Sequence, residues 1–207
     1  VNADGTLHIK TGSQSVDTIT NSGTVNLDDD LTVRVLTNNA SGTFNQNADI
    51  TATDTTLSAI MNGIWNVTGG EDSDTRVLNT TTLTGDATVT LVDYLDTASN
   101  LKINQSGTST FDGSIAGNGA VEKTGLGTLR ISDAQTFTGG LDVTGGTFQT
   151  LAGGTLANNL DIHVFEDSTF IAGAIDEVGS VLIDSDGTFT MNANISTQGD
   201  FTNNGLL

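Results

Sequence analysis

The chain has 207 residues with no cysteine and no proline, and 25 acidic against 6 basic side chains give it a net charge of −19. This charge opposes binding to nucleic acid or anionic lipid, which both reward Lys and Arg, and it favours solubility and attraction of cations. The sequence contains no apolar run long enough for a transmembrane helix, and without cysteine its core cannot depend on disulfides.

A Gly-Thr-apolar-polar-apolar phrase, or a degraded copy of it, recurs along the chain in steps of 18 to 22 residues. The copies begin at Gly5, Gly23, Gly42, Gly63, Gly85, Gly107, Gly127, Gly146, Ser168, Gly187 and Gly205. Self-similarity at a nearly fixed period indicates a chain that is built by stacking one structural unit on itself.

Each copy predicts a short strand with one buried face, because apolar residues stand two and four positions after the glycine with a polar residue between them. The first apolar position is filled by Leu7, Val25, Phe44, Trp65, Ala87, Ser109, Leu129, Phe148, Phe170, Phe189 and Leu207. The second is filled by Ile9, Leu27, Gln46, Val67, Val89, Phe111, Ile131, Thr150, Ala172 and Met191. We expect each set to form one continuous column in the core.

Further alternating runs fill the rest of each period, and Gly, Asn, Asp and Ser separate them as turn residues. These runs predict strands over 31–35, 89–91, 101–103, 141–143, 160–164 and 181–183. Helix signals are nearly absent, since Gly and β-branched residues dominate the composition of these runs. A unit of about twenty residues holds two or three strands, and it buries its apolar face only against copies of itself.

We therefore predict an all-β, right-handed parallel β-helix of about ten rungs, with roughly 20 residues per rung, over the single segment 1–207. An antiparallel sandwich is the alternative, because its strands also alternate and recur at short intervals. A sandwich does not need one column filled alike in every repeat, and it would show more two-residue hairpin signals. Neither end has the atypical sequence of a capping repeat, so we interpret 1–207 as a fragment of a longer protein.

Residues 117–148 contain a more specific pattern: Gly-x-Gly, then Lys-x-Gly-x-Gly-Thr-Leu, then an aromatic-Thr-Gly-Gly step, then Gly-Gly-Thr. This frame resembles the passenger-associated strand repeat of bacterial type V autotransporters. The match is carried by Lys123, Gly125, Gly127, Thr128, Leu129, Phe137, Thr138, Gly139, Gly140, Gly145, Gly146 and Thr147. Leu141 departs from the family, which has Thr at that position.

The resemblance implies a passenger segment that is secreted across the bacterial outer membrane and displayed on the cell surface as an adhesin or adhesin stalk. In that family the strand repeat supports secretion and folding of the passenger. Each rung contacts only its neighbours, so folding can nucleate once and then propagate along the chain. The expected partner is a host or neighbouring-cell surface component, or a second copy of the protein. We expect no nucleic-acid partner and no insertion of this segment into the membrane.

The alternative function is a secreted β-helix enzyme that acts on polysaccharide as a lyase or hydrolase. Such a site needs paired carboxylates, or acidic residues that bind Ca²⁺ beside a basic residue. The basic residues do not cluster in the sequence, and both His8 and His163 stand at outward positions of alternating strands. We therefore predict no catalytic residues, no enzymatic activity and no cofactor. A groove with three converging carboxylates and a basic residue would favour the enzyme.

Three acidic clusters, over 28–30, 71–74 and 184–187, are the candidates for weak Ca²⁺ sites, because hard cations prefer oxygen ligands. The last begins like an EF-hand loop, but Ile195 stands where that loop needs Glu. We interpret all three clusters as solvated turns and predict no metal site. Paired asparagines such as Asn38 and Asn39 are interpreted as turn residues that form side-chain ladders between rungs. Trp65 is predicted to lie in the core and Tyr94 in a lateral loop.

Overall fold

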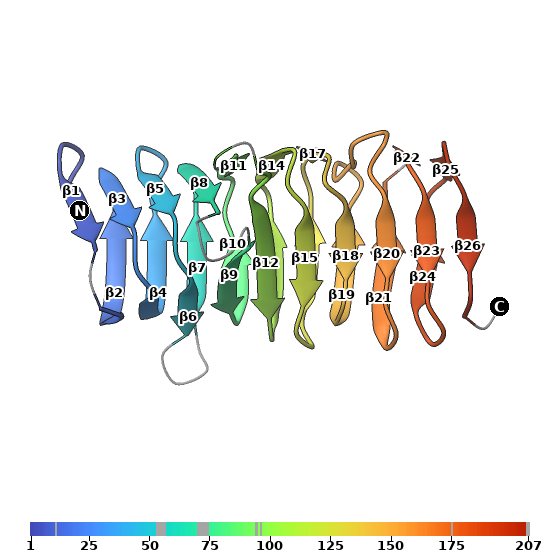
Figure 1. Ribbon diagram of the computed structural model, residues 1–207, viewed down its shortest axis with the longest axis horizontal. Helices are drawn as coiled ribbons and strands as arrows, with labels where there is room; N and C mark the ends of the chain where they lie inside the picture. The colour runs from blue at the N-terminus through green and yellow to red at the C-terminus, as the bar shows by residue number, and fades with distance from the viewer. Residues whose placement is uncertain are drawn as a thin grey trace.

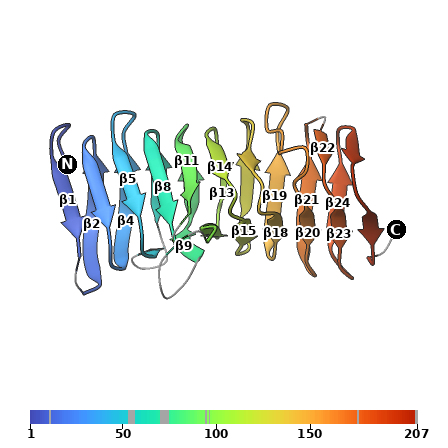
Figure 2. The same cartoon turned by 45° about the horizontal axis from the view of Figure 1, so that its top comes forward.

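The computed structural model describes residues 1–10, 12–52, 57–69, 75–93, 95, 97–174 and 176–205. Every element assigned in these residues is a β-strand, and each paired strand runs parallel to its partners in the neighbouring coils. The coils follow one another along a rod, with the two chain ends at opposite ends of it (Figures 1 and 2). No helix in the described residues is long and apolar enough to cross a membrane.

The strands form three faces, which we name A, B and C in the order in which each coil visits them. Face A comprises β1 (Thr6–Ile9), β3 (Thr24–Leu27), β5 (Thr43–Gln46), β8 (Ile64–Thr68), β11 (Thr88–Val92), β14 (Ser114–Gly117) and β17 (Thr136–Phe137). Near the C-terminus, β22 (Asp176–Val178) and β25 (Ile195–Thr197) form a separate two-stranded sheet.

Face B comprises the first halves of β2 (Gln14–Asn21) and β4 (Leu31–Asn38), followed by β6 (Ile50–Ala52), β9 (Thr75–Thr80), β12 (Asn100–Gln105), β15 (Val121–Thr124), β18 (Leu141–Val143), β20 (Ile162–Val164), β23 (Val181–Ile183) and β26 (Phe201–Asn203). Face C comprises the second halves of β2 and β4, followed by β7 (Ser58–Met61), β10 (Thr82–Thr84), β13 (Thr108–Phe111), β16 (Thr128–Ile131), β19 (Gly146–Thr150), β21 (Ser168–Ala172) and β24 (Thr188–Met191). Strand β4 belongs to both faces because Leu31–Val33 pair with β6 and Val35–Asn38 pair with β7.

The register of the strands gives the size of one coil. On face B the successive partners Leu101, Val121, Leu141 and Ile162 lie 20, 20 and 21 residues apart. The chain makes about nine coils of about 20 residues, slightly fewer than the ten that the sequence predicts. The predicted parallel β-solenoid is confirmed, and parallel pairing throughout the described strands excludes the antiparallel sandwich.

The predicted core column divides into two columns on different faces. Leu7, Val25, Phe44 and Trp65 are partners on face A, whereas Ser109, Leu129, Phe148, Phe170 and Phe189 are partners on face C. On face A, Trp65 pairs with Val89 and not with the predicted Ala87. The reason is that the coils from Ile64 to Thr88 and from Thr88 to Ser114 have 24 and 26 residues. These two coils are longer than the spacing between copies of the phrase. The copies before them therefore lie on face A, and the copies from Gly107 to Gly187 lead into strands of face C.

Three phenylalanines of the column on face C are stacked, as the repeat predicts. The ring centroids of Phe148 and Phe170 lie 5.9 Å apart, and those of Phe170 and Phe189 lie 4.9 Å apart. Both pairs are close to parallel, with interplanar angles of 9° and 21°. Phe148 and Phe170 are buried, so burial of apolar area and stacking of equivalent rings stabilise the same contacts.

Buried amide side chains close several corners between faces. Asn21 Nδ2 donates to the carbonyl oxygens of Gly23 in its own turn and Thr43 in the next coil, at 3.2 and 2.9 Å. Gln105 Nε2 does the same at a later corner, with Gly107 O at 2.9 Å and Thr128 O at 3.0 Å. A buried carbonyl without a donor costs free energy, so these amides stabilise both the turn and the contact between coils.

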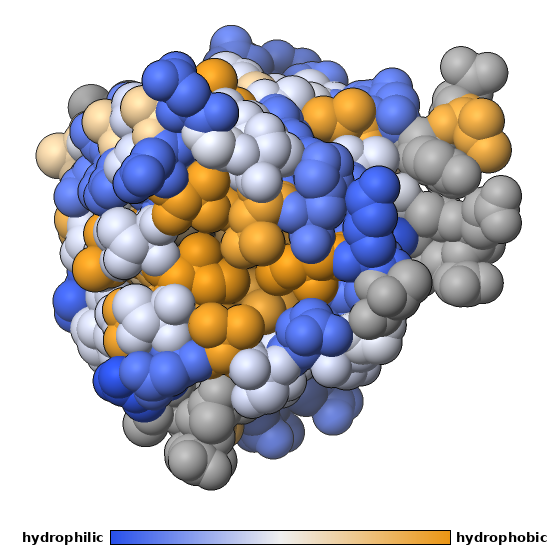
Figure 3. All heavy atoms as spheres, turned by 90° about the vertical axis from the view of Figure 1, so that its left-hand side faces the viewer, coloured by the Kyte–Doolittle hydropathy of each residue, from blue (hydrophilic) through white to orange (hydrophobic). Residues whose placement is uncertain are grey.

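Both ends of the rod expose residues of the core columns. At the N-terminal end Leu7 and Val16 are 36% and 37% exposed, and Figure 3 shows a contiguous apolar patch there. At the other end Met191 and Phe201 are exposed. In the interior of the rod the equivalent positions are buried because each coil covers the one before it.

Candidate functional site

Outward side chains at equivalent positions of successive coils form ladders on each face, because parallel strands in register place like residues side by side. On face A, Asn45 Nδ2 donates to Asn26 Oδ1 at 2.6 Å, and Asn66 Nδ2 donates to Asn45 Oδ1 at 2.8 Å. Asn26 Nδ2 lies 3.3 Å from the ring nitrogens of His8, which is exposed as predicted. We name Asn26, Asn45 and Asn66 the asparagine ladder.

Face A carries no Asp, Glu, Lys or Arg in any of its seven strands, although the chain has a net charge of −19. A second outward column beside the asparagine ladder contains Thr6, Thr24, Thr43, Ile64, Thr88 and Ser114. Face A is therefore an uncharged surface of amide and hydroxyl groups on a strongly acidic protein.

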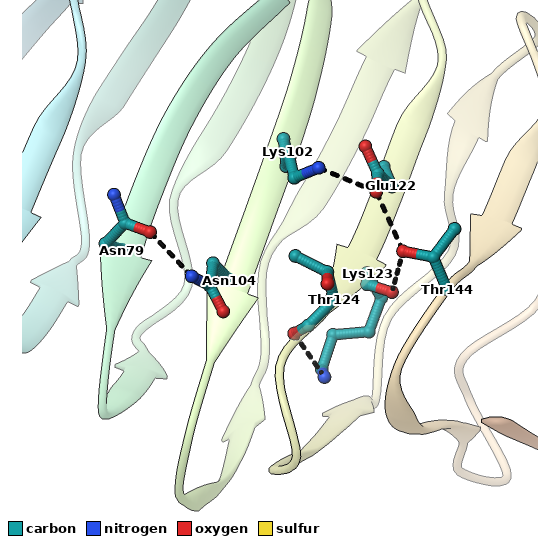
Figure 4. Close-up of polar contacts among 7 residues, drawn as sticks. All are labelled: Asn79, Lys102, Asn104, Glu122, Lys123, Thr124 and Thr144. Carbon is teal, nitrogen blue, oxygen red and sulfur yellow. Dashed lines mark hydrogen bonds and ion pairs between the residues drawn. The ribbon is translucent and has the colours of Figure 1, made fainter. Parts of the chain in front are cut away.

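Face B carries a row of charged side chains that the sequence analysis did not assemble. Lys102, Glu122, Asp142 and His163 are successive partners across four coils. Lys102 Nζ pairs with Glu122 Oε1 at 2.9 Å, and Thr144 Oγ1 donates to the same oxygen at 2.7 Å (Figure 4). We name Lys102, Glu122, Asp142 and His163 the charged row.

Asp142 lies between Glu122 and His163 in the charged row. Burial raises the pKa of the Asp142 carboxyl above its ordinary value; the charge of His163 opposes this shift and that of Glu122 adds to it. His163 Nε2 lies 3.1 Å from Asp184 Oδ2, and its ring stacks on Phe165 with centroids 3.7 Å apart. His163 is thus half-buried and partnered, which differs from the exposed residue that the sequence predicts.

A hollow of about 110 Å³ adjoins the charged row and is lined by Glu122, Asp142, Asn100 and Thr75 among others. Glu122 and Asp142 are carboxyl groups on adjacent coils, and glycoside hydrolysis also uses a pair of carboxyl groups. The row could be found in the sequence only through the coil length, because its members lie 20, 20 and 21 residues apart.

Lys123 is fully buried, although it is a basic residue of an outwardly acidic protein. Its side chain lies in an inward column between Ile103 and Val143, and Nζ donates to the carbonyl oxygens of Thr124, Gly125 and Gly145 at 2.8, 3.0 and 3.1 Å. Figure 4 shows this lysine turned toward the corner that follows β15. Burial lowers the pKa of Lys123 to about 8. The ammonium group joins two consecutive coils, which is a structural role.

The other residues of the autotransporter-like motif do not converge on one site. Leu129 and Phe137 lie in the core, and Thr128 and Thr147 are outward partners on face C. Backbone hydrogen bonds to the neighbouring coil are made by the N–H groups of Gly127, Thr138 and Gly139. Positive φ angles are adopted by Gly125, Gly140 and Gly146. Gly145 accepts the bond from Lys123. These positions fit requirements of turns and packing.

Several carboxylates of the acidic turns contact the neighbouring coil, whereas Asp29 Oδ1 accepts from the N–H of Asp30 in its own turn. Asp28 Oδ1 accepts from Asn47 Nδ2 at 2.8 Å, Asp30 Oδ1 accepts from the N–H of Asp49 at 3.2 Å, and Asp184 pairs with His163. In the part of the chain that the structure describes, no group of three or more His, Cys, Asp or Glu side chains is arranged to hold a metal ion. The cluster at 71–74 and Tyr94 fall outside the described residues.

Trp65 occupies the core of face A, as predicted, and is 1% exposed. Its indole Nε1 donates to Oε1 of the buried Gln46 at 3.1 Å, which explains a glutamine in a column of apolar residues.

No protein family, no curated protein and no solved structure that was compared with the chain matches it. Function is therefore inferred from the surfaces of the three faces and from the resemblance of residues 117–148.

Proposed function

We propose that this chain is a non-enzymatic segment of a cell-surface autotransporter passenger, which acts as an adhesin or as the stalk of one. The observation that carries the proposal is parallel pairing of strands through about nine consecutive coils. At ~4.8 Å per coil these form a rod of roughly 43 Å. A rod of this kind holds a binding region away from a cell or presents one along its side.

Secretion and surface display are supported by the way the coils depend on one another. Each coil contacts its immediate neighbours, so a chain that emerges from a pore can fold progressively on the coil already formed. Lys123 bonds carbonyls of its own turn and of the following coil, and it lies in the segment that resembles the passenger strand repeat. This contact joins two consecutive coils and so supports the addition of one coil to the next.

Adhesion is supported by the regular outward ladders. Many weak contacts along one side of a rod add up to stable attachment when they are made together. The partner is a surface component of a host or neighbouring cell, or a second copy of the protein.

The test uses the full parent protein displayed on bacterial cells. In one variant the segment 1–207 is deleted, and in another it is replaced by an unrelated β-solenoid with the same number of coils. An adhesin loses attachment and aggregation in both variants, whereas a stalk loses them only in the deletion. Unchanged attachment in the deletion variant would contradict the proposal.

The second candidate is an enzyme that acts on polysaccharide, and the observation that favours it is the Glu122–Asp142 pair beside the hollow on face B. Purified protein would be incubated with neutral and acidic polysaccharides, and new reducing ends or unsaturated products would be measured. An enzyme loses activity in both Glu122→Gln and Asp142→Asn. The exposed Asp17, which pairs with Arg34 at 2.7 Å, supplies the control Asp17→Asn. If the wild type releases no product, this candidate is wrong.

A further inference from the structure

We propose that face A is a docking surface for a linear, uncharged polysaccharide. This inference rests on the proposed adhesive function, because it names the chemical class of the partner. It depends on three features of the face: the absence of charge, the free hydrogen-bonding groups of the asparagine ladder, and the area of the face.

The distribution of charge separates face A from face B most clearly, while the strands of face C that follow β4 carry one charged residue, Arg130. Its strands contain no Asp, Glu, Lys or Arg, whereas strands of face B contain Asp17, Arg34, Lys102 and Glu122 among others. An anionic polymer would meet the negative potential of a chain with net charge −19 and find no cation on this face to offset it. An uncharged polymer meets no such repulsion.

The asparagine ladder leaves N–H donors and oxygen acceptors free to bond the hydroxyls of a sugar. A carboxamide has two N–H donors and two acceptor positions on its oxygen. Asn45 uses one N–H toward Asn26 and one acceptor position toward Asn66, so one donor and one acceptor remain. A sugar hydroxyl both donates and accepts, and the ladder repeats this pair of groups every ~4.8 Å along the rod. Thr24 and Thr43 add hydroxyls in the neighbouring column.

The area of face A fits a narrow ligand better than a second copy of the chain. Seven strands at ~4.8 Å and a width of about four residues give roughly 380 Å². Two copies joined through this face would bury roughly 760 Å² in total, which is below the ~1,200 Å² of a stable protein interface. A polysaccharide chain that lies along the ladder needs only a strip of this width. Ile64, which is 49% exposed, offers it an apolar contact near the middle of the face.

The test titrates the purified 207-residue chain with cello-, manno-, xylo- and maltohexaose and with a hexamer of galacturonic acid, by NMR of the backbone amides. We expect at least one neutral hexasaccharide to shift amide signals of face A, with a dissociation constant on the order of 1 mM. Asn45→Asp keeps the shape of the side chain but adds a charge and removes a donor, so it should weaken binding at least fivefold. The exposed Ile64→Glu disturbs no hydrogen bond of the ladder and should weaken binding similarly.

The matched control is Asn104→Asp on face B, where Asn104 Nδ2 donates to Asn79 Oδ1 at 2.7 Å in an equivalent ladder (Figure 4). This variant should bind as the wild type does.

The inference is overturned if no neutral hexasaccharide binds, if the galacturonate hexamer binds more tightly, or if Asn104→Asp weakens binding as much as Asn45→Asp. It is also overturned if sedimentation shows a dimer that Asn45→Asp dissociates, since the occupant is then a second copy. If cells need the segment for attachment but the chain binds no glycan, this inference alone is overturned. If the chain binds glycan but has no role in attachment, the proposed function alone is overturned.

Discussion

The ring of Phe170 stacks on that of Phe189 in the next coil, with centroids 4.9 Å apart, and Phe148 stacks on its other side at 5.9 Å. Phe170 is therefore the middle member of a three-ring stack in the core of face C. Its contacts join three coils, so it tests how strongly the columns stabilise the rod.

Phe170→Ala should lower the free energy of unfolding by about 3–5 kcal/mol, because it removes a buried ring and leaves a cavity between two aromatic neighbours. Urea denaturation followed by circular dichroism measures the change. Thr169→Ala, an outward substitution on the same strand, is the control and should change stability by less than about 0.5 kcal/mol. Equal effects of the two substitutions would contradict the stacked column.

Gln46→Leu should lower the free energy of unfolding by about 1–3 kcal/mol, because the indole N–H of Trp65 is then buried without an acceptor. Trp65→Phe removes the indole donor. This substitution should therefore lower the free energy of unfolding less in the Gln46→Leu variant than in the wild type. Chemical denaturation of the four proteins of this cycle gives the coupling between the two residues. Strict additivity would show that the 3.1 Å contact contributes nothing.

The free energy of unfolding of the wild type should increase relative to that of Lys123→Met as the pH rises from 8 to 10.5. The pKa of Lys123 is lowered to about 8 in the folded state, so the unfolded chain binds more protons in this window and stability rises with pH. The change approaches about 3 kcal/mol, since each pKa unit corresponds to ~1.4 kcal/mol. Denaturation midpoints of both proteins at pH 7 and pH 10 test this, and a constant difference would contradict a lowered pKa.

Gly146→Ala should destabilise the protein by at least about 2 kcal/mol more than Gly12→Ala does. Both glycines have positive φ, +63° and +73°, so the conformational cost of a side chain is similar. A Cβ on Gly146 would lie 2.4 Å from the carbonyl oxygens of Gly125 and Gly127, whereas one on Gly12 would meet no atom within 4 Å. Thermal unfolding of the two variants compares them directly, and equal melting temperatures would show that the corner tolerates a methyl group.

Asp142→Asn should raise the melting temperature at pH 7. The pKa of Asp142 is raised in the folded state, so the ionised carboxylate opposes folding above that pKa, and the cost disappears as the pH falls below it. The advantage of the asparagine should therefore shrink toward pH 3, where both folded and unfolded Asp142 are protonated. Scanning calorimetry across this range gives the result. A variant that is less stable than the wild type at pH 7 would instead indicate that the charge of Asp142 is stabilised by His163.

The period of the sequence was sufficient to predict strands, parallel coils and the stacking of Phe148, Phe170 and Phe189. It was not sufficient to assign each copy of the phrase to a face, because a Gly-Thr turn precedes strands on both face A and face C. The prediction that Ala87 follows Trp65 is wrong for a related reason, since the 24-residue coil from Ile64 to Thr88 moves the register on face A to Val89.

The local sequence pattern also did not predict that Lys123 is buried or that the charged row assembles. Lys123 lies at an inward position of its strand, but its acceptors include Gly145 of the following coil. Lys102 and Glu122 meet only because this coil places them 20 positions apart along the chain. The sequence showed only that the basic residues do not cluster along the chain. The fold pairs Arg34 with Asp17 and Lys102 with Glu122, and it buries Lys123.

The sequence alone determined that the chain forms short strands, which side of each strand is buried, and that the strands stack as a solenoid. These properties follow from the alternation of neighbouring side chains and from the repeat, which are local or periodic. The tertiary structure decided which repeats share a face, which charges meet on face B and that face A is free of charge. Those properties depend on the accumulated length of every coil, since each side chain finds its neighbours about twenty residues away along the chain.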